Sequence, residues 1–213
     1  MKTTQLNSQQ AYRLWSAQYD SDLNKTRDLE AIALRTTLAD IVFKDCLEIG
    51  CGTGKNTAWL LTKAKQLTAV DFSPEMLAKA KEKIISEKVC FIHADITNNW
   101  NFTTHQYQLI SFSLVLEHIE DLNLVFREAA KATAASGYWY IGELHPFKQY
   151  TGTKARFDTA DGQKEVACFT HHISAFTQLA KLHSFSIEKI DEYFDNGDKT
   201  SIPRILTLLL KKN

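Results

Sequence analysis

Three glycines at alternate positions follow a short apolar segment, and this feature constrains the fold more than any other. Gly50, Gly52 and Gly54 come directly after Leu47-Glu48-Ile49, and a helical pattern begins near Asn56. Glycine permits positive φ and lets a ligand approach the main chain, while a helix start offers N–H groups and a positive dipole end. The sequence therefore predicts a strand, a glycine turn and a helix arranged around a cofactor.

The spacing of these glycines separates three kinds of nucleotide-binding loop. A P-loop would need glycine where Ile49 stands and serine or threonine where Asn56 stands. A dinucleotide loop would need its third glycine, which lets helix and strand pack closely, at Lys55. The pattern acidic-x-Gly-x-Gly-x-Gly, starting at Glu48, is matched in full. The segment resembles the first motif of the class I S-adenosylmethionine-dependent methyltransferases, of the small-molecule, type 11-like kind.

Length and composition favour one soluble α/β domain spanning residues 1–213. The chain is 44% hydrophobic and has 25 basic and 25 acidic residues without a basic run, so we expect no nucleic-acid partner. Its four cysteines show no CxxC spacing, which is typical of reduced thiols in a cytoplasmic protein. The N-terminus lacks an apolar leader, and no apolar run approaches the roughly 18 residues of a membrane span. We expect a cytoplasmic monomer or homodimer without a membrane partner.

Strands and helices alternate along the chain, which predicts a parallel sheet with helices on both faces. The resemblance implies a Rossmann-like seven-stranded sheet of order 3-2-1-4-5-7-6 whose last strand is antiparallel. After the first strand, the predicted strands are 67–72, 89–96, 107–116, 138–144, 185–193 and 204–210. The predicted helices are 28–41, 56–65, 74–87, 121–133 and 174–183, with Gly137 as the stop of the fourth of these.

An acidic residue ends the second predicted strand. Asp71 lies 21 residues beyond Gly50, near the distance at which an acidic side chain reaches ribose hydroxyls. Ser73-Pro74 is a better helix start, so Asp71 is not needed as a cap. The segment Asp71 to Leu77 resembles the second motif of the family. That resemblance implies that Phe72 and Met76 flank the adenine or ribose.

Later strand ends complete the expected cofactor site. By the resemblance, Asp95 accepts a hydrogen bond from the adenine amino group and Ile96 covers the ring, although an Asp at a strand end is also a common turn former. Ser113 and Leu114 would place backbone carbonyls near the methionine ammonium. The full set expected to bind S-adenosyl-L-methionine is Trp15, Tyr19, Glu48, Gly50, Cys51, Gly52, Gly54, Asn56, Asp71, Phe72, Met76, Asp95, Ile96, Ser113 and Leu114.

Residues 1–40 and 145–172 are expected to flank the site. Aromatic residues of the first segment, including Trp15 and Tyr19, either cover an edge of the core or form a helical lid whose ring faces attract a sulfonium cation. The second segment is polar and irregular in pattern, which is typical of a substrate-side insertion. Its residues Lys148, Lys154 and Arg156 suggest a small molecule with a carboxylate, or simply a solvated charged loop.

Histidines near the expected strand ends are candidate general bases for an acceptor that must lose a proton. His118 and His145 are the first candidates and His172 the next; because strand alternation would point His171 and His172 to opposite faces, one of that pair is expected to be structural. For His118, a backbone hydrogen bond near a helix start is an equal alternative. No metal is expected, because the histidines lack metal-ligand spacing. The predicted function is methyl transfer to a small-molecule acceptor; the alternatives are a non-catalytic S-adenosylmethionine-binding module or an NAD(P)-binding Rossmann enzyme.

Overall fold

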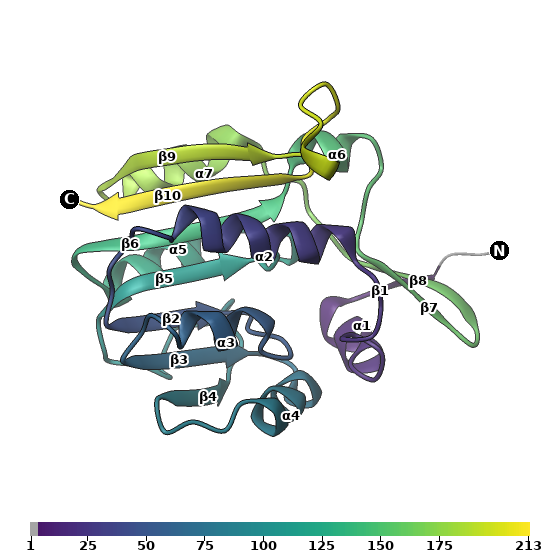
Figure 1. Cartoon of the computed structure of the whole chain (residues 1–213), viewed down its shortest axis with the longest axis horizontal. Coiled ribbons are helices and arrows are strands. Elements are labelled where there is room, and N and C mark those ends of the chain that lie inside the picture. Colours follow the sequence, from purple (N-terminus) through teal and green to yellow (C-terminus); the bar gives the residue numbers. More distant parts are fainter. Residues whose placement is uncertain (1–3) are drawn as a thin grey trace.

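A mixed seven-stranded sheet forms the centre of the computed structural model, which describes residues 4–213 (Figure 1). Its strand order is β4-β3-β2-β5-β6-β10-β9, and β10 is antiparallel to both of its neighbours. The predicted order 3-2-1-4-5-7-6 is thereby confirmed, including the antiparallel last strand. The strands are β2 (Asp45–Ile49), β3 (Gln66–Asp71), β4 (Val89–His93), β5 (Tyr107–Ser113), β6 (Thr133–Leu144), β9 (Phe185–Tyr193) and β10 (Ile205–Lys212).

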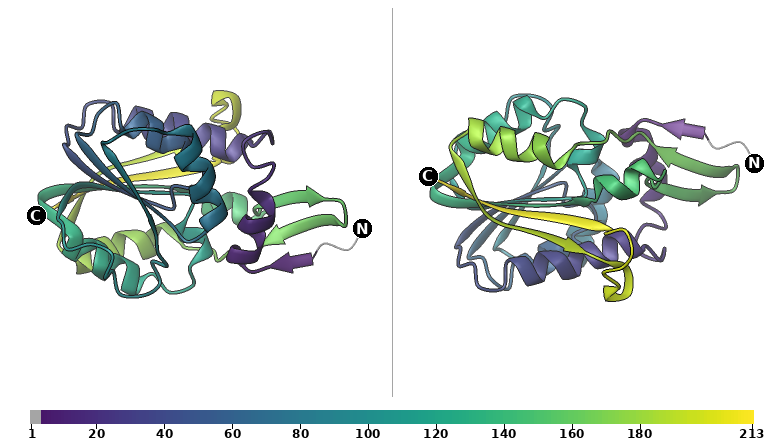
Figure 2. Two further views of the ribbon diagram at one scale, coloured as in Figure 1. Left: turned by 90° about the horizontal axis from the view of Figure 1, so that it is seen from below. Right: turned by 90° about the horizontal axis from the view of Figure 1, so that it is seen from above.

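Helices cover both faces of the sheet (Figure 2). One face packs against α2 (Lys25–Thr37), α3 (Lys55–Leu60) and α4 (Pro74–Lys83), which contribute leucines to one buried cluster. The opposite face packs against α5 (Asn123–Ala132) and α7 (Ile173–Leu182). Within the described residues, none of these helices has the length and apolar character that crossing a membrane requires.

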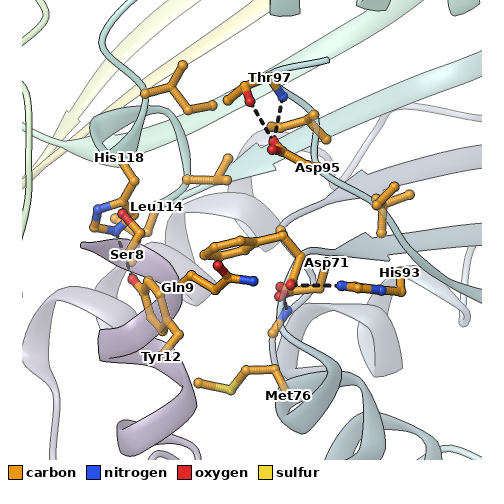
Figure 3. A pocket seen from close by; sticks show the side chains of 18 of the residues that line it. Ser8, Gln9, Tyr12, Asp71, Met76, His93, Asp95, Thr97, Leu114 and His118 are labelled. Atoms are coloured by element: carbon orange, nitrogen blue, oxygen red, sulfur yellow. Dashed lines mark hydrogen bonds between the residues drawn. The ribbon is translucent and has the colours of Figure 1, made fainter. Parts of the chain in front are cut away.

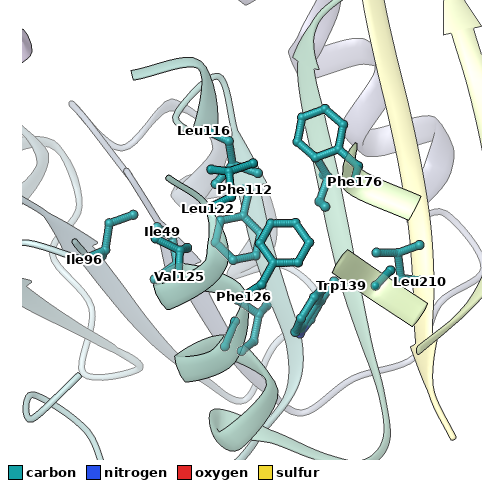
Figure 4. Close-up of a cluster of buried hydrophobic side chains, with 14 of the residues drawn as sticks. Ile49, Ile96, Phe112, Leu116, Leu122, Val125, Phe126, Trp139, Phe176 and Leu210 are labelled. Atoms are coloured by element: carbon teal, nitrogen blue, oxygen red, sulfur yellow. The ribbon is translucent and has the colours of Figure 1, made fainter. Parts of the chain in front are cut away.

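The core under α5 and α7 is dominated by aromatic rings (Figure 4). Trp139 of β6 is fully buried, and its ring centroid lies 5.2 Å from that of Phe126 and 3.8 Å from that of Phe185. Its indole N–H donates to the Thr133 hydroxyl at 2.7 Å, so burial leaves no unpaired donor. This wholly apolar side anchors β5 and β6, whose carboxyl ends reach the functional site.

The helix α5 ends earlier than predicted. It stops at Ala132 and the chain enters β6 at Thr133, so Gly137 lies inside a strand and is not a helix stop. Gly137 is needed there for space, because a Cβ would lie 2.8 Å from the Thr133 methyl and 2.9 Å from the Ala134 carbonyl oxygen. Glycine occurs both where two backbone segments approach closely and at helix C-termini, so the residue type alone did not distinguish the two positions.

A second, three-stranded sheet of order β1-β8-β7 stands at one end of the molecule. The segment 145–172 is thus not irregular: after α6 (Pro146–Tyr150) it forms a hairpin of β7 (Arg156–Thr159) and β8 (Gly162–Val166). β1 (Thr4–Leu6) pairs with β8, and α1 (Ser8–Trp15) packs on this sheet. β1 and α1 (residues 4–15) and the hairpin β7–β8 (residues 156–166) therefore form one unit, here called the outer unit (Figures 1 and 2). The helix α2, which lies later in the N-terminal segment, packs on the central sheet instead.

Candidate functional site

A cavity of about 620 Å³ lies between the carboxyl ends of the central strands and the outer unit (Figure 3). This is the edge where ligands bind in open α/β sheets, beside the point at which the strand order reverses between β2 and β5. Its wall consists of Asn7, Ser8, Gln9, Tyr12, Tyr19, Gly50, Gly52, Val70, Asp71, Phe72, Met76, His93, Ala94, Asp95, Ile96, Thr97, Ser113, Leu114, Val115, His118 and Ile119.

The glycine loop contributes Gly50 and Gly52 to this wall. All three glycines have positive φ, but their surroundings differ. A Cβ at Gly52 would meet nothing within 4 Å, whereas a Cβ at Gly54 would lie 2.7 Å from Ile84 and one at Gly50 2.8 Å from Val115. Gly52 therefore keeps cavity space open for a ligand. Gly54 instead lets the start of α3 pack closely, and it does not line the cavity.

Asp71 connects the end of β3 to the glycine loop. One carboxylate oxygen accepts the Gly52 N–H at 2.8 Å and the other accepts the Ser73 N–H at 2.9 Å. Burial raises the pKa of Asp71, and these backbone hydrogen bonds partly offset that effect. A carboxylate has about four lone-pair sites, so Asp71 can accept further hydrogen bonds, as a ribose diol would require.

Phe72, Met76, Asp95 and Ile96, the residues expected around the nucleoside, all line the cavity. The Asp95 carboxylate also organises its own turn. It accepts hydrogen bonds from the Thr97 N–H at 2.9 Å and the Thr97 hydroxyl at 2.7 Å (Figure 3). The turn-forming and ligand-binding interpretations of Asp95 are therefore compatible with each other.

Five of the residues predicted to contact the cofactor lie outside the cavity wall, and Glu48 and Asn56 are buried beneath the glycine loop. The Thr57 hydroxyl donates to Glu48 at 2.5 Å, and the Asn56 amide donates to Glu30 of α2 at 2.9 Å. Trp15 stacks on Phe157 with ring centroids 4.9 Å apart, so it belongs to the core of the outer unit. The wall excludes Trp15, Glu48, Cys51, Gly54 and Asn56 and includes the other ten.

The buried Glu48 makes the stability of this protein depend on pH. Burial raises the pKa of Glu48 from 4.5 to about 8, with Glu30 as a further cause and the Thr57 hydrogen bond opposing it. Between these two pH values the unfolded chain loses this proton and the folded chain retains it. The free energy of unfolding should therefore fall by about 1.4 kcal/mol per pH unit from this group alone.

Glu48→Gln is expected to remove that contribution. Because glutamine stays uncharged, the variant should gain stability relative to the wild type as the pH rises from 5 to 8. Urea unfolding at both pH values measures the change, and the exposed Glu87→Gln is the matched control. A wild-type-to-variant difference that is the same at both pH values would contradict this interpretation.

His118 lies at the other end of the cavity, where the outer unit contacts the central sheet (Figure 3). Its Nδ1 lies 3.0 Å from the Ala167 carbonyl oxygen, which can only accept, so Nδ1 carries the proton. Its Nε2 lies 2.8 Å from the Tyr12 hydroxyl. Burial raises the pKa of Tyr12 well above its ordinary value, so this phenol keeps its proton and donates it to Nε2. The Nε2 lone pair is thus directed at the Tyr12 hydroxyl, which itself lines the cavity.

The other candidate bases do not line the cavity. His145 is fully buried at the start of α6, where Nδ1 accepts the Phe147 N–H and Nε2 lies 3.0 Å from Glu192. His172 precedes α7 and contacts the Tyr150 hydroxyl. His171 contacts the Ile119 carbonyl oxygen at 2.8 Å. The last two lie in a loop, so the strand alternation used to separate them does not apply.

The three basic residues of the insertion that suggested an acceptor carboxylate are paired with acidic side chains. Lys154 and Arg156 contact Glu165 at 2.7 and 3.0 Å, and Lys148 lies 3.6 Å from Asp195. None of the three lines the cavity. Their positions therefore agree with the solvated-loop interpretation and give no support to an acceptor carboxylate.

Tyr12 and Asn7 line the cavity although the sequence did not reveal them, and Glu117 lies beside His118 without lining the cavity. Asn7 caps α1, and Asn followed by a helical pattern was the available signal for this helix start. Glu117, His118 and Cys168 offer one potential metal-ligand atom each within 4.8 Å, a cluster found in the search of residues 4–213. Both ring nitrogens of His118 already have hydrogen-bond partners, which argues for proton chemistry at this cluster.

Comparison with known proteins agrees with the motifs. Residues 47–141 match the family model described as a methyltransferase domain. A demethylmenaquinone methyltransferase of Chlamydia pneumoniae is 32% identical over 48% of this chain and 45% of its own length. A magnesium-protoporphyrin O-methyltransferase of Rhodobacter capsulatus is 25% identical over 55% of this chain and 59% of its own. The chain thus spans about half the length of the curated relatives it matches.

Solved structures share the whole fold. The N-methyltransferase NodS of Bradyrhizobium japonicum WM9, in complex with S-adenosyl-L-homocysteine, superposes with a TM-score of 0.72. The two chains are 21% identical, and the match covers 97% of this chain and 99% of the other. The fold, the order of the motifs and the match of residues 47–141 to a methyltransferase domain all agree with the resemblance to the class I S-adenosylmethionine-dependent methyltransferases. The resemblance first seen at Glu48 to Gly54 is confirmed.

Proposed function

We propose that the protein binds S-adenosyl-L-methionine in this cavity and transfers its methyl group to a small-molecule acceptor by in-line displacement. The observation that carries the proposal is the shape of the cavity: a glycine loop and Asp71 lie at one end, and the His118 imidazole, whose Nε2 contacts the Tyr12 hydroxyl, lies at the other. The family match of residues 47–141 supports it independently.

The residues present fit such a cofactor. Gly52 leaves space at the main chain, and Asp71 can accept hydroxyl hydrogen bonds at the end of β3. Tyr12, Tyr19 and Phe72 place aromatic rings on the wall, and ring faces attract cations. The wall contains Asp71 and Asp95 but no Lys or Arg among the described residues. This charge balance suits a cationic cofactor.

The protein's contribution to the reaction is positioning, exclusion of water and handling of one proton. When bound, the cofactor supplies an activated methyl group. His118 would receive the acceptor's proton at Nε2, since Nδ1 is held in its protonated form by the Ala167 carbonyl oxygen. The Tyr12 hydroxyl now occupies the place of an acceptor group at hydrogen-bond distance from Nε2. A bound acceptor would displace this hydroxyl.

The outer unit is proposed as a lid, since it supplies Asn7, Ser8, Gln9 and Tyr12 to the wall. Tyr19 follows it, and the Arg27 guanidinium lies 4.4 Å above the Tyr19 ring. Covering the cavity in this way would exclude water from the methyl group. Residues 1–213 are proposed to act as one domain of a cytoplasmic protein.

Titration calorimetry with S-adenosyl-L-homocysteine and with NADH tests the cofactor assignment. We expect S-adenosyl-L-homocysteine to bind and NADH not to bind, because Lys55 occupies the place of the third dinucleotide-loop glycine. Tight NADH binding alone would overturn the assignment.

Incubation with methyl-labelled cofactor and a cell metabolite extract tests the reaction. Label transferred to a small molecule is the expected result. Cofactor binding without any release of S-adenosyl-L-homocysteine would favour the alternative, a non-catalytic binding module.

A further inference from the structure

The end of the cavity next to His118 has an unusual charge environment. Glu117 precedes His118 in a 3-10 turn at residues 116–118, and it is only 6% exposed. Its side chain accepts one hydrogen bond, from the Gln149 amide at 3.2 Å. Among residues 4–213, no Lys or Arg forms an ion pair with it. A buried carboxylate without a cation is costly, so this corner favours a positive charge.

The nearest group able to carry that charge is His118. Glu117 Oε1 lies 3.9 Å from His118 Nε2, the nitrogen that contacts the Tyr12 hydroxyl at the cavity wall. A proton received at Nε2 would therefore be stabilised by the Glu117 carboxylate, as would a cationic group bound beside Nε2.

The same carboxylate opposes negative charge on its neighbours. Burial is the main reason that the pKa of Tyr12 is raised, and Glu117 raises it further. Burial and then Glu117 raise the pKa of the Cys168 thiol to about 12. Tyr12 and Cys168 indicate how a phenol or thiol bound at this position would ionise, and both of these side chains are kept protonated. An acceptor that must become a phenolate or thiolate would meet the same opposition.

We propose that the acceptor is a primary or secondary amine, an inference that rests on the proposed methyl transfer. It binds as its ammonium ion beside His118 Nε2, with Glu117 as its counter-charge. Anionic acceptors are disfavoured, because the wall has no Lys or Arg among the described residues and Lys148, Lys154 and Arg156 are paired elsewhere.

The proton and charge balance of this reaction suits the site. The ammonium gives one proton to His118 Nε2, and the neutral amine nitrogen forms a bond to the methyl carbon. The carbon–sulfur bond breaks and its electron pair stays on sulfur, so the positive charge moves to the methylated nitrogen. His118 then releases its proton to solvent. No anionic nucleophile arises beside Glu117 at any stage, whereas phenol or thiol methylation would require one.

A matched ligand series tests the proposal on the intact protein saturated with S-adenosyl-L-homocysteine. Benzylamine, benzyl alcohol and benzoate differ only in the head group. At pH 7 we expect benzylamine to bind at least about tenfold more tightly than benzyl alcohol, and benzoate to bind most weakly. Glu117→Gln keeps the side-chain volume and an acceptor for Gln149, and should abolish the preference for the amine. The exposed Glu120→Gln is the matched control.

Several outcomes would overturn the proposal. They are equal binding of amine and alcohol, preference for benzoate, absence of binding by all three, or methyl label recovered on oxygen or sulfur from the extract. A stoichiometric zinc complex abolished by Cys168→Ser would assign Glu117 to a metal instead. The comparison of the three ligands in the wild-type protein still tests the proposal if Glu117→Gln does not fold. Failure of S-adenosyl-L-homocysteine to bind would instead overturn the proposed function, which separates the two.

Discussion

Replacing His118 with asparagine is expected to lower methyl-transfer turnover by about 10² to 10⁴-fold, the usual contribution of a general base. His118 lines the cavity and its unprotonated nitrogen contacts the Tyr12 hydroxyl, whereas His145 is committed to Phe147 and Glu192. Asparagine can still donate to the Ala167 carbonyl oxygen. The affinity for S-adenosyl-L-homocysteine should therefore stay within a few-fold of wild type.

Two further variants separate proton transfer from anchoring of the outer unit. Tyr12→Phe removes the hydroxyl that contacts Nε2 and leaves the base in place, so turnover should change far less than in His118→Asn. His105→Asn changes an exposed histidine of the loop before β5 and should have no effect. The rate of methyl-label transfer to the metabolite extract measures the turnover of all three variants, His118→Asn, Tyr12→Phe and His105→Asn. Full turnover by a folded His118→Asn protein would remove His118 from the mechanism.

The central sheet could be predicted because its signals are local. β2 and β3 contain apolar runs, and a glycine and an acidic residue mark their carboxyl ends. Gly52 and Asp71 are 19 residues apart, yet one hydrogen bond joins them, because parallel strands bring their carboxyl ends to one edge. The order of the motifs along the chain therefore predicted that Gly52 and Asp71 lie together in the site. The strand order followed from the family resemblance.

The outer unit could not be predicted in the same way. β1 has only three residues and pairs with β8 across more than 150 positions, so neither segment contains the information for the pairing. Trp15 shows the consequence. As an aromatic residue near the site it suited a cofactor lid, but Phe157 of the hairpin stacks on it and gives it a core role. Long-range pairing decides which rings remain available to a ligand.

The acidic residues of the two motifs, Glu48 and Asp71, differ in whether their side chains reach the cavity. Glu48 is inside β2 and its side chain points under α3, where Thr57 donates to it. Asp71 is the last residue of β3, so its carboxylate reaches the cavity edge. The two motifs indicate that an acidic residue is required at each position, but they do not indicate which of the two side chains reaches the ligand. Glu48 supports the glycine loop from below, whereas Asp71 can do so and also face the cofactor.

Asp71→Ala is expected to weaken binding of S-adenosyl-L-homocysteine by about 10² to 10⁴-fold. Hydrogen bonds to a charged acceptor contribute on the order of 1.5 to 3 kcal/mol each, and a ribose diol would lose two of them. The variant also releases the Gly52 and Ser73 N–H groups, which loosens the glycine loop. Calorimetry against wild type measures the loss, and the exposed Asp40→Ala is the matched control.

Methylthioadenosine, which has the ribose but not the amino-acid end, distinguishes the two contributions. If Asp71 binds the ribose hydroxyls, this ligand and S-adenosyl-L-homocysteine should lose the same factor in affinity. If Asp71 acts only through Gly52, the loss should be confined to the ligand whose amino-acid end lies against the glycine loop. Unchanged affinity for both ligands in a folded variant would show that Asp71 serves the turn alone, and the nucleoside would then have to be held from the Asp95 side of the cavity.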